Sequence, residues 1–148
     1  MRTRKRILFL AMAVFMVANC VLPFTVNAAL PEDNLVSPMA NNVEKVISTF
    51  IISNGVAQIV ASYTGYSGIT TGATITVKLQ KKFLFWWNDV DNGQPDDTWT
   101  ANLTGWKNSV SYSLALSNTG DYRAVFTYTI RGAGGAADEI SETLEYTY

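Results

Sequence analysis

Hydrophobic and polar residues alternate along the chain from about residue 46 to its end. In residues 109–117, the apolar residues Val110, Tyr112, Leu114 and Leu116 are separated mostly by serine. A period of two places successive side chains on opposite faces of a strand, so that one face is buried and the other meets solvent. No segment of this region shows a sustained helical period. The pattern therefore predicts strands rather than helices.

Eight segments have this strand-like character, and residues such as Gly, Asn and Asp separate them. Asn54-Gly55 lies between two of them and is typical of a two-residue hairpin turn, because a type I′ turn needs positive φ at both positions. We expect strands at about 46–53, 56–64, 73–81, 84–90, 98–103, 109–117, 120–131 and 139–147. Short strands without intervening helices predict an all-β fold, an antiparallel immunoglobulin- or fibronectin-III-like β-sandwich of seven to eight strands.

The segment Asn118–Ala124 has the layout of a tyrosine corner. In this motif of immunoglobulin-like sandwiches, a tyrosine near the start of a core strand bonds back to the backbone a few residues upstream. Gly120 would turn the chain here, and Tyr122 would begin the strand. Antibody domains have a cysteine two residues after the tyrosine, whereas this chain has Ala124. The alternative, an ordinary hairpin turn followed by a core tyrosine, predicts a sandwich as well.

The N-terminus has the three parts of a secretory signal peptide. Four basic residues within residues 1–6 precede the apolar run Ile7–Phe24, and Val26 and Ala28 suit the positions before a cleavage site. We therefore expect cleavage after Ala28 and a secreted protein that acts outside the cell or at its surface. A retained membrane anchor and a lipid attached to Cys20 are the alternatives.

The chain then divides into three parts: a signal peptide at 1–28, an extended leader or linker at 29–45, and a β-sandwich domain at 46–148. The leader contains two prolines and has no hydrophobic period. The 120 residues that follow the signal peptide suit one domain with its own core.

The charge of the exported part argues against two classes of partner. After cleavage, seven basic and twelve acidic residues remain, which gives a net charge of −5. A chain of this sign has no overall electrostatic attraction to nucleic acid or to anionic lipid. We therefore expect no nucleic-acid partner and, once the signal peptide is removed, no membrane partner.

The exported part lacks the residues that most hydrolases use. The chain has no histidine, and its one cysteine, Cys20, lies in the signal peptide. A serine nucleophile would have to rely on a lysine base, and nothing in the local sequence supports such a pair. Paired carboxylates on a polar loop lack the burial that raises the pKa of a catalytic acid. We expect a protein that is not an enzyme, with no catalytic residue and no cofactor.

Four carboxylates, those of Asp89, Asp91, Asp96 and Asp97, lie within nine residues. Calcium prefers such oxygen-rich loops. The spacing departs from that of an EF-hand loop, because Gly93 stands at the fifth position and no bidentate glutamate follows. We expect a solvated acidic loop, with calcium binding as the alternative.

Four tryptophans, Trp86, Trp87, Trp99 and Trp106, lie within 21 residues. Neighbouring residues of a strand face opposite sides, so Trp86 and Trp87 do not both join the core. We expect Trp87 in the core and Trp86 outside it, and we regard both as candidate ligand-binding residues. Exposed tryptophans stack on sugar rings or anchor protein interfaces. In the alternative, three of the four tryptophans are core residues and the fourth covers a sheet edge or the hairpin.

Four short motifs resemble a family that carries a domain of unknown function. The family consists of small secreted proteins from Gram-positive bacteria, and the resemblance covers about residues 50–148 through Gly55–Ala57, Ile75–Lys82, Trp87–Val90 and Gly120–Arg123. It implies a β-sandwich without an assigned activity and transfers no functional residue. Where the family has a short polar hairpin, this chain has Phe83–Trp86, so we expect a more apolar hairpin here.

These observations favour a secreted, non-enzymatic β-sandwich module that mediates a protein interaction at or outside the cell surface. The alternative is a module that binds carbohydrate or cell-wall glycan through exposed tryptophan. A row of exposed aromatic rings on one face would favour a glycan of the cell envelope, and a mixed apolar patch would favour an extracellular protein.

Overall fold

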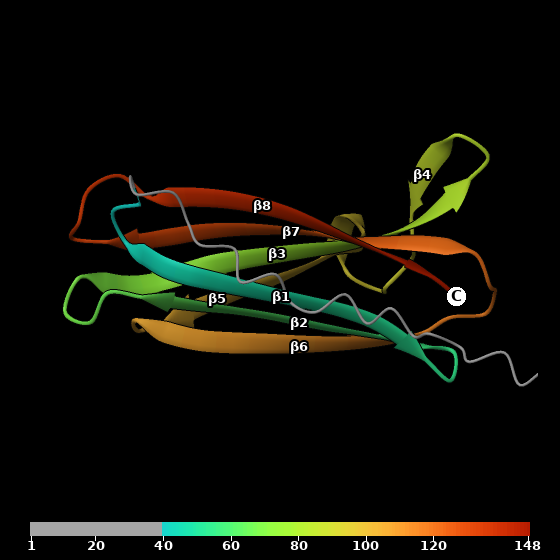
Figure 1. The fold of residues 1–148 in the computed structure, drawn as a ribbon, viewed down its shortest axis with the longest axis horizontal. Helices are drawn as coiled ribbons and strands as arrows, with labels where there is room; N and C mark the ends of the chain where they lie inside the picture. The colour runs from blue at the N-terminus through green and yellow to red at the C-terminus, as the bar shows by residue number, and fades with distance from the viewer. Residues whose placement is uncertain (1–39) are drawn as a thin grey trace, which may run out of the picture.

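A computed structural model describes residues 40–148 of the protein (Figure 1). The expected signal peptide, residues 1–28, and the expected leader up to residue 39 lie outside the described residues. Within residues 40–148, no helix is long and apolar enough to span a membrane.

Each of the eight expected strands is present, with bounds that differ by a few residues. The strands are β1 (Val43–Ser53), β2 (Val56–Gly65), β3 (Thr70–Phe83), β4 (Trp86–Asp89), β5 (Thr98–Thr104), β6 (Lys107–Ala115), β7 (Asp121–Gly132) and β8 (Asp138–Thr147), and a short 3₁₀ turn, η1 (Pro95–Asp97), precedes β5. The first strand begins at Val43, so the last three residues of the expected leader belong to the sheet. The expected strand at 84–90 is shorter, because a turn occupies residues 84 and 85.

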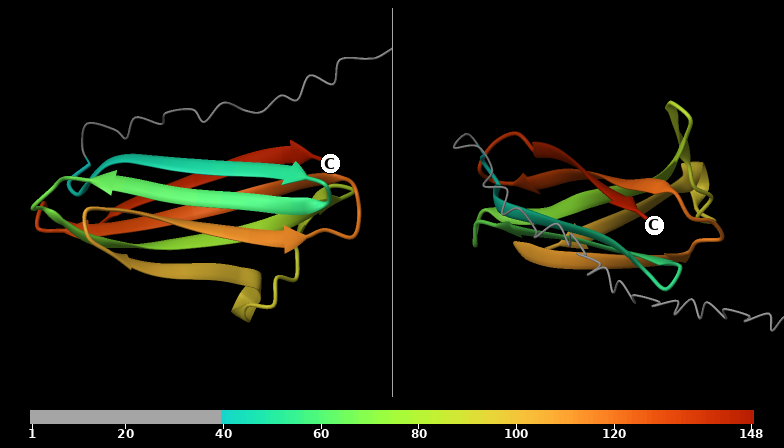
Figure 2. Two further views of the ribbon diagram at one scale, coloured as in Figure 1. Left: turned by 90° about the horizontal axis from the view of Figure 1, so that it is seen from below. Right: turned by 45° about the vertical axis from the view of Figure 1, so that its right-hand side comes forward.

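The strands form two antiparallel sheets that pack face to face. One sheet has the order β1-β2-β6, and the other has the order β4-β3-β7-β8, with β5 pairing along the same edge of β3 as β4 does. Figure 2 shows the narrower sheet lying across the wider one. This arrangement confirms the predicted β-sandwich.

The core lies between the sheets and consists of alternate residues of the central strands. On β7 these are Tyr122, Ala124, Phe126, Tyr128 and Ile130, which are all buried. The alternation that predicted strands from the sequence thus also identifies the core positions. The inward residues of β6 and β8 are only half-buried, as is expected for strands at the edge of a sandwich.

One polar pair lies within this core. The hydroxyl groups of Ser48 on β1 and Tyr128 on β7 lie 2.6 Å apart and hydrogen bond across the two sheets. Burial raises the pKa of Tyr128 well above its usual value, so this phenol stays neutral. The pair satisfies two polar groups that would otherwise be costly to bury.

The predicted tyrosine corner is present at the start of β7. Tyr122 is 3% exposed, and its hydroxyl donates a hydrogen bond of 2.6 Å to the carbonyl oxygen of Asn118. Gly120 has φ +142°, a conformation that a side chain would disfavour, and it exchanges two backbone hydrogen bonds with Tyr148. The corner therefore fixes the turn into β7 and ties it to the end of β8.

At the opposite end of the sandwich, Asp138 joins the first strand to the last. Its carboxylate accepts hydrogen bonds from the backbone N–H groups of Asn41 (3.0 Å), Asn42 (2.6 Å) and Val43 (3.0 Å). The side chain of Asn42 also donates to the carbonyl oxygen of Ala136 at 2.7 Å. These bonds hold the two sheets together where β1 begins and β8 starts.

The corner predicts the effect of removing one hydroxyl. In Tyr122→Phe the ring remains in the core, but the bond to Asn118 is lost, and we expect the free energy of unfolding to fall by about 0.5–1.5 kcal/mol. Urea unfolding measures this change. Tyr66→Phe, at a tyrosine that is 39% exposed, is the matched control. Equal stability of the Tyr122 variant and the wild type would show that the corner bond contributes nothing.

Candidate functional site

The most unusual surface of the described chain is the turn between β3 and β4. Phe83, Leu84, Phe85 and Trp86 are 66%, 71%, 89% and 72% exposed. Large apolar side chains are seldom exposed in a continuous run, and such runs usually mark binding surfaces. We call these four residues the apolar tip. They stand out from the sandwich with the hairpin that ends β3 (Figure 1).

The geometry of a two-residue turn produces this tip. Phe83 pairs with Trp86 across the hairpin, which leaves Leu84 and Phe85 as the turn residues. Leu84 has φ +55°, which is a rare backbone conformation for a large side chain. Neither residue is a usual turn former, which is why the sequence predicted that the second strand begins at residue 84 rather than after a turn at residues 84 and 85.

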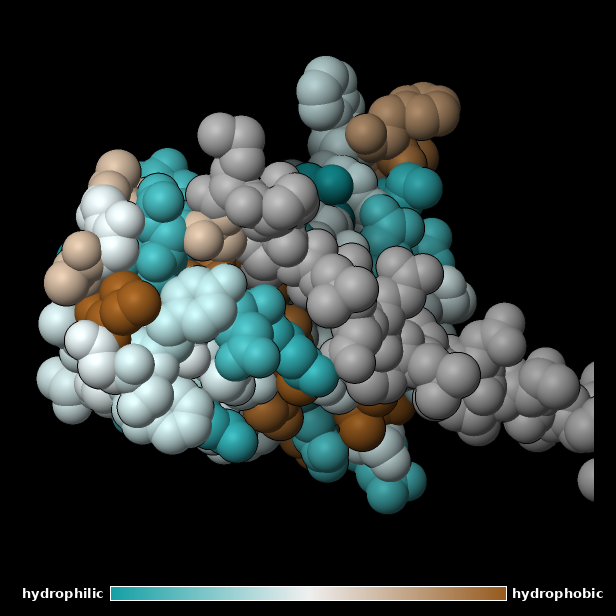
Figure 3. Space-filling view, turned by 60° about the vertical axis from the view of Figure 1, so that its left-hand side comes forward, coloured by the Kyte–Doolittle hydropathy of each residue, from teal (hydrophilic) through white to brown (hydrophobic). Residues whose placement is uncertain are grey.

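The tip is exposed because the hairpin extends past the sandwich. Pairing of β3 with β7 ends at Lys81 and Tyr122, and beyond that point β3 pairs with β4. Phe83 has the same parity on β3 as the buried residues Val77 and Leu79, yet it is 66% exposed. The inward pattern of the strand therefore continues beyond the end of the core. In the space-filling view, hydrophobic side chains gather on the part that stands out at the top (Figure 3).

Trp87 lies on the outer face of the wider sheet. It pairs with Lys82, whose ammonium lies 5.7 Å from the centre of the indole ring, and the Arg123 guanidinium lies 4.4 Å from the same ring. Such cation–π contacts are attractive. Trp87 is half-buried by these neighbours and lies outside the core. The expectation that Trp87 is a core residue is therefore wrong. The two-residue turn at 84 and 85 places Trp87 on the same face as its partner Lys82 and not on the face of Phe83. The expected exposure of Trp86 is confirmed.

Three cations surround the hairpin directly behind the tip, and we call them the cationic collar. Lys82 and Arg123 lie on the outer face beside Trp87, whereas the ammonium of Lys81 lies 5.4 Å from the ring centre of Tyr122 on the inner side. The collar therefore borders both faces of the hairpin. Lysine and arginine stems can cover apolar surface while their charged ends reach solvent.

A chain of hydrogen bonds anchors the base of the hairpin to the sheet. The Nε of Arg123 donates to Oε1 of Gln80 at 2.7 Å, and Nε2 of Gln80 donates to Oδ1 of Asp89 at 2.6 Å. Lys78 completes the chain with an ion pair to Oδ2 of Asp89 at 2.9 Å. These bonds link β7, β3 and β4 on the outer face.

The anchor also sets the charge of Asp89. The hydrogen bonds from Gln80 and Lys78 lower the pKa of Asp89 below its usual value. The bond to Asp89 likewise raises the pKa of Lys78. Both groups therefore stay ionised over a wide pH range, and the carboxylate is engaged within the protein.

The other two tryptophans have different roles. Trp99 is 8% exposed and stacks on Tyr112, with ring centres 5.1 Å apart, so that it closes the edge between β5 and β6. Trp106 is 45% exposed in the turn between these strands. Only Trp99 of the four belongs to the core, so the alternative of three core tryptophans is wrong.

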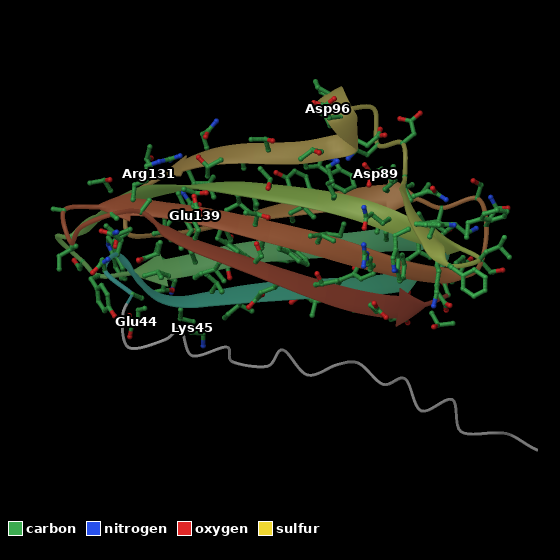
Figure 4. All side chains as sticks on the ribbon, turned by 90° about the horizontal axis from the view of Figure 1, so that it is seen from above. Glu44, Lys45, Asp89, Asp96, Arg131 and Glu139 are labelled. Carbon is green, nitrogen blue, oxygen red and sulfur yellow. The ribbon has the colours of Figure 1, made fainter. Side chains whose placement is uncertain are left out.

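The acidic loop after β4 is held by local turns. Oδ1 of Asp91 accepts a hydrogen bond from the N–H of Gly93, and both Asp96 and Asp97 have positive φ. Figure 4 shows Asp89 and Asp96 well separated along the sheet from Arg131 and Glu139, which lie toward one end. Within residues 40–148, no three His, Cys, Asp or Glu side chains come together in a group that could hold a metal ion.

A shallow depression of about 400 Å³ lies across β1, β2 and β6. Its lining includes Glu44, Lys45, Tyr63 and Lys107. The Tyr63 hydroxyl is engaged, because it donates to the carbonyl oxygen of Gly105 at 2.7 Å. Figure 4 places Glu44 and Lys45 at the end of the sandwich away from Asp89, so the depression is separate from the hairpin.

Comparison with known proteins identifies only distant structural similarity. No protein-family model matches the chain, and no curated protein matches it. Two crystal structures of wild-type OgpA from Akkermansia muciniphila are similar at a TM-score of 0.42, with 15% and 14% identity, over 76% of this chain and 30% and 32% of those chains. A catalytically inactive OgpA in complex with an O-glycopeptide substrate has a TM-score of 0.37 and 15% identity, and the match covers 76% of this chain and 34% of that chain.

The chain thus spans about a third of the OgpA chains that it matches. At TM-scores below 0.5, this likeness carries no statement about activity. The resemblance to a family of small secreted proteins stays a prediction.

The anchor predicts a pH dependence of stability. The pKa of Asp89 is lower in the folded protein than in the unfolded chain, where it is about 3.9. The stabilisation is therefore complete above that value and is lost as the pH falls through the folded pKa. We expect Asp89→Asn to be less stable than the wild type at pH 6, and the difference to shrink toward pH 2. Chemical unfolding at several pH values measures it, and a constant difference would contradict the anchor.

The acidic loop predicts the outcome of a calcium titration. Because Asp89 is already bound by Lys78 and Gln80, and because no three carboxylates of residues 40–148 come together, we expect no calcium binding at micromolar concentration. Isothermal titration calorimetry checks this result. Micromolar affinity that is lost in Asp89→Ala would refute it.

Proposed function

We propose that the protein is a non-enzymatic binding module that acts at or outside the cell surface and docks through its apolar tip. The single observation that carries this proposal is the run of four exposed large apolar residues, Phe83–Trp86. Such a run is costly in water unless a partner covers it. The hydrogen-bonded anchor at its base supports the same view, because a rigid hairpin loses little entropy on binding.

The geometry favours an apolar acceptor over a glycan platform. Stacking on sugar rings uses flat, accessible aromatic faces. Trp86 offers such a ring, but the ring of Trp87 already contacts Arg123 and Lys82. Leu84 and Phe85 give the tip a convex, mainly apolar end. The tip therefore supports docking on an apolar surface better than it supports the alternative of glycan binding.

The proposal predicts that one substitution at the tip abolishes docking. Phe85 is 89% exposed, so Phe85→Asp leaves the fold intact and places a charge at the centre of the contact. We expect the fraction of exported protein that sediments with cell envelopes of the producing organism to fall about tenfold or more.

Val60→Asp is the matched control, since Val60 is an exposed apolar residue of β2, 41% exposed and outside the tip. Thermal unfolding of both variants verifies that they are folded. Equal sedimentation of Phe85→Asp and the wild type would exclude the tip as the docking surface.

A further inference from the structure

The side chains of the hairpin are arranged in layers along its length. The apolar tip forms the outermost layer, and the next pair of residues, Lys82 and Trp87, combines a cation with an indole. Behind them lie Lys81 and Asn88, and then Gln80 and Asp89. From the turn toward the sandwich, the side chains are therefore first apolar, then cationic and aromatic, and then polar, with the one acid, Asp89, paired to Lys78.

This order matches that of a membrane surface. A lipid leaflet presents hydrocarbon in its interior, phosphate groups above it and water beyond. Tryptophan is enriched at the headgroup level because its ring is apolar and its N–H is polar. We propose that the apolar tip inserts into the interface of an anionic lipid membrane, with the cationic collar against the phosphates. This inference rests on the proposed function and names the partner of the same surface.

The shape of the tip favours lipid over a protein partner. A stable protein interface buries about 800 Å² on each side across a fitted surface. Here two of the apolar residues form a two-residue turn and the other two flank it, and this hairpin stands out from the sandwich (Figure 1). A rigid protein would have to offer a recess of matching depth, whereas a leaflet closes around any small convex apolar group. Leu84 and Phe85 at the apex reach furthest and would enter the leaflet first.

The charge near the tip differs from that of the whole domain. The net charge of −5 led us to expect no membrane partner, but charges in solution are screened beyond about 8 Å at physiological salt. The collar places Lys81, Lys82 and Arg123 beside the tip. Among the nearby acids, Asp89 forms an ion pair with Lys78, Glu145 lies opposite Arg123 in the register of β7 and β8, and Asp121 accepts a hydrogen bond from Thr147. Lys81 and Lys82, which directly precede the tip on β3, supply the positive charge closest to it.

Binding to synthetic vesicles tests the proposal. The exported protein, its N-terminus established by intact-mass analysis, is sedimented with vesicles of phosphatidylglycerol and phosphatidylcholine and with vesicles of phosphatidylcholine alone. We expect binding to the anionic vesicles that weakens as salt is raised. We also expect a blue shift of tryptophan emission that is smaller in Trp86→Phe, because Trp86 moves from water into lipid.

Variants distinguish the contribution of the apolar tip to vesicle binding from that of the cationic collar. Phe85→Asp should lower partitioning into anionic vesicles about tenfold to a hundredfold, as expected when one buried phenylalanine is lost. The double variant Lys81→Gln/Lys82→Gln should lower it about tenfold on anionic vesicles and much less on neutral ones. Val60→Asp and Lys107→Gln, which change an exposed apolar residue and a lysine outside the hairpin, are the controls and should stay close to the wild type.

Two results would overturn the inference, and they leave the proposed function in different positions. In the first, Phe85→Asp loses binding to cell envelopes, but neither the wild type nor any variant binds the vesicles. The tip then docks on another partner, and loss of wild-type binding to protease-treated envelopes identifies that partner as a protein. If vesicle binding occurs but is unchanged in Phe85→Asp and Trp86→Phe, the tip is not the membrane contact. Unchanged envelope binding in the same variants would reject the proposed function itself.

Discussion

The whole structure depends on the burial of one inward row of side chains by an opposing sheet. Each strand of a sandwich alternates, and its inward residues are stable only where the other sheet covers them. On β7 this condition holds from Tyr122 to Ile130. On β3 it holds as far as Leu79, and the strand then continues to Phe83 with the same alternation. The apolar tip is therefore the inward pattern of a core strand extended beyond the core.

An extended hairpin of this kind needs separate support, and the outer face provides it. Two-stranded hairpins are marginally stable on their own. The hydrogen bonds from Arg123 through Gln80 to Asp89 tie β4 to β3 and β7 at the point where the sandwich ends. The contact between Arg123 and Trp87 covers one indole and leaves the other, Trp86, outside. Arg123 thus both supports the hairpin and contributes positive charge behind its tip.

Much of the fold follows from local sequence signals. Period-two alternation in several segments, together with β-rich runs between Gly, Asn and Asp residues, predicted all eight strands, and the glycine and tyrosine of the corner were identified because that motif has fixed spacing. The position of the turn at the tip could not be predicted from the sequence. Leu84 and Phe85 have none of the features of turn residues, so their turn, and the changed parity of Trp87, depend on pairing between β3 and β4 rather than on local preference. The role of Arg123 depends on contacts between residues distant in sequence, which periodicity does not reveal.

In the free protein, the apolar tip is open to water, whereas the inward residues of the central strands are buried. Hydroxyl-radical footprinting with mass spectrometry measures this directly, because the oxidation rate of a side chain follows its exposure to solvent. The structure predicts fast oxidation of Phe83, Leu84, Phe85 and Trp86, and slow oxidation of Trp99 and Phe126. Protection of the four tip residues to the level of Trp99 would show that the hairpin folds back onto the sandwich and that the tip is not exposed.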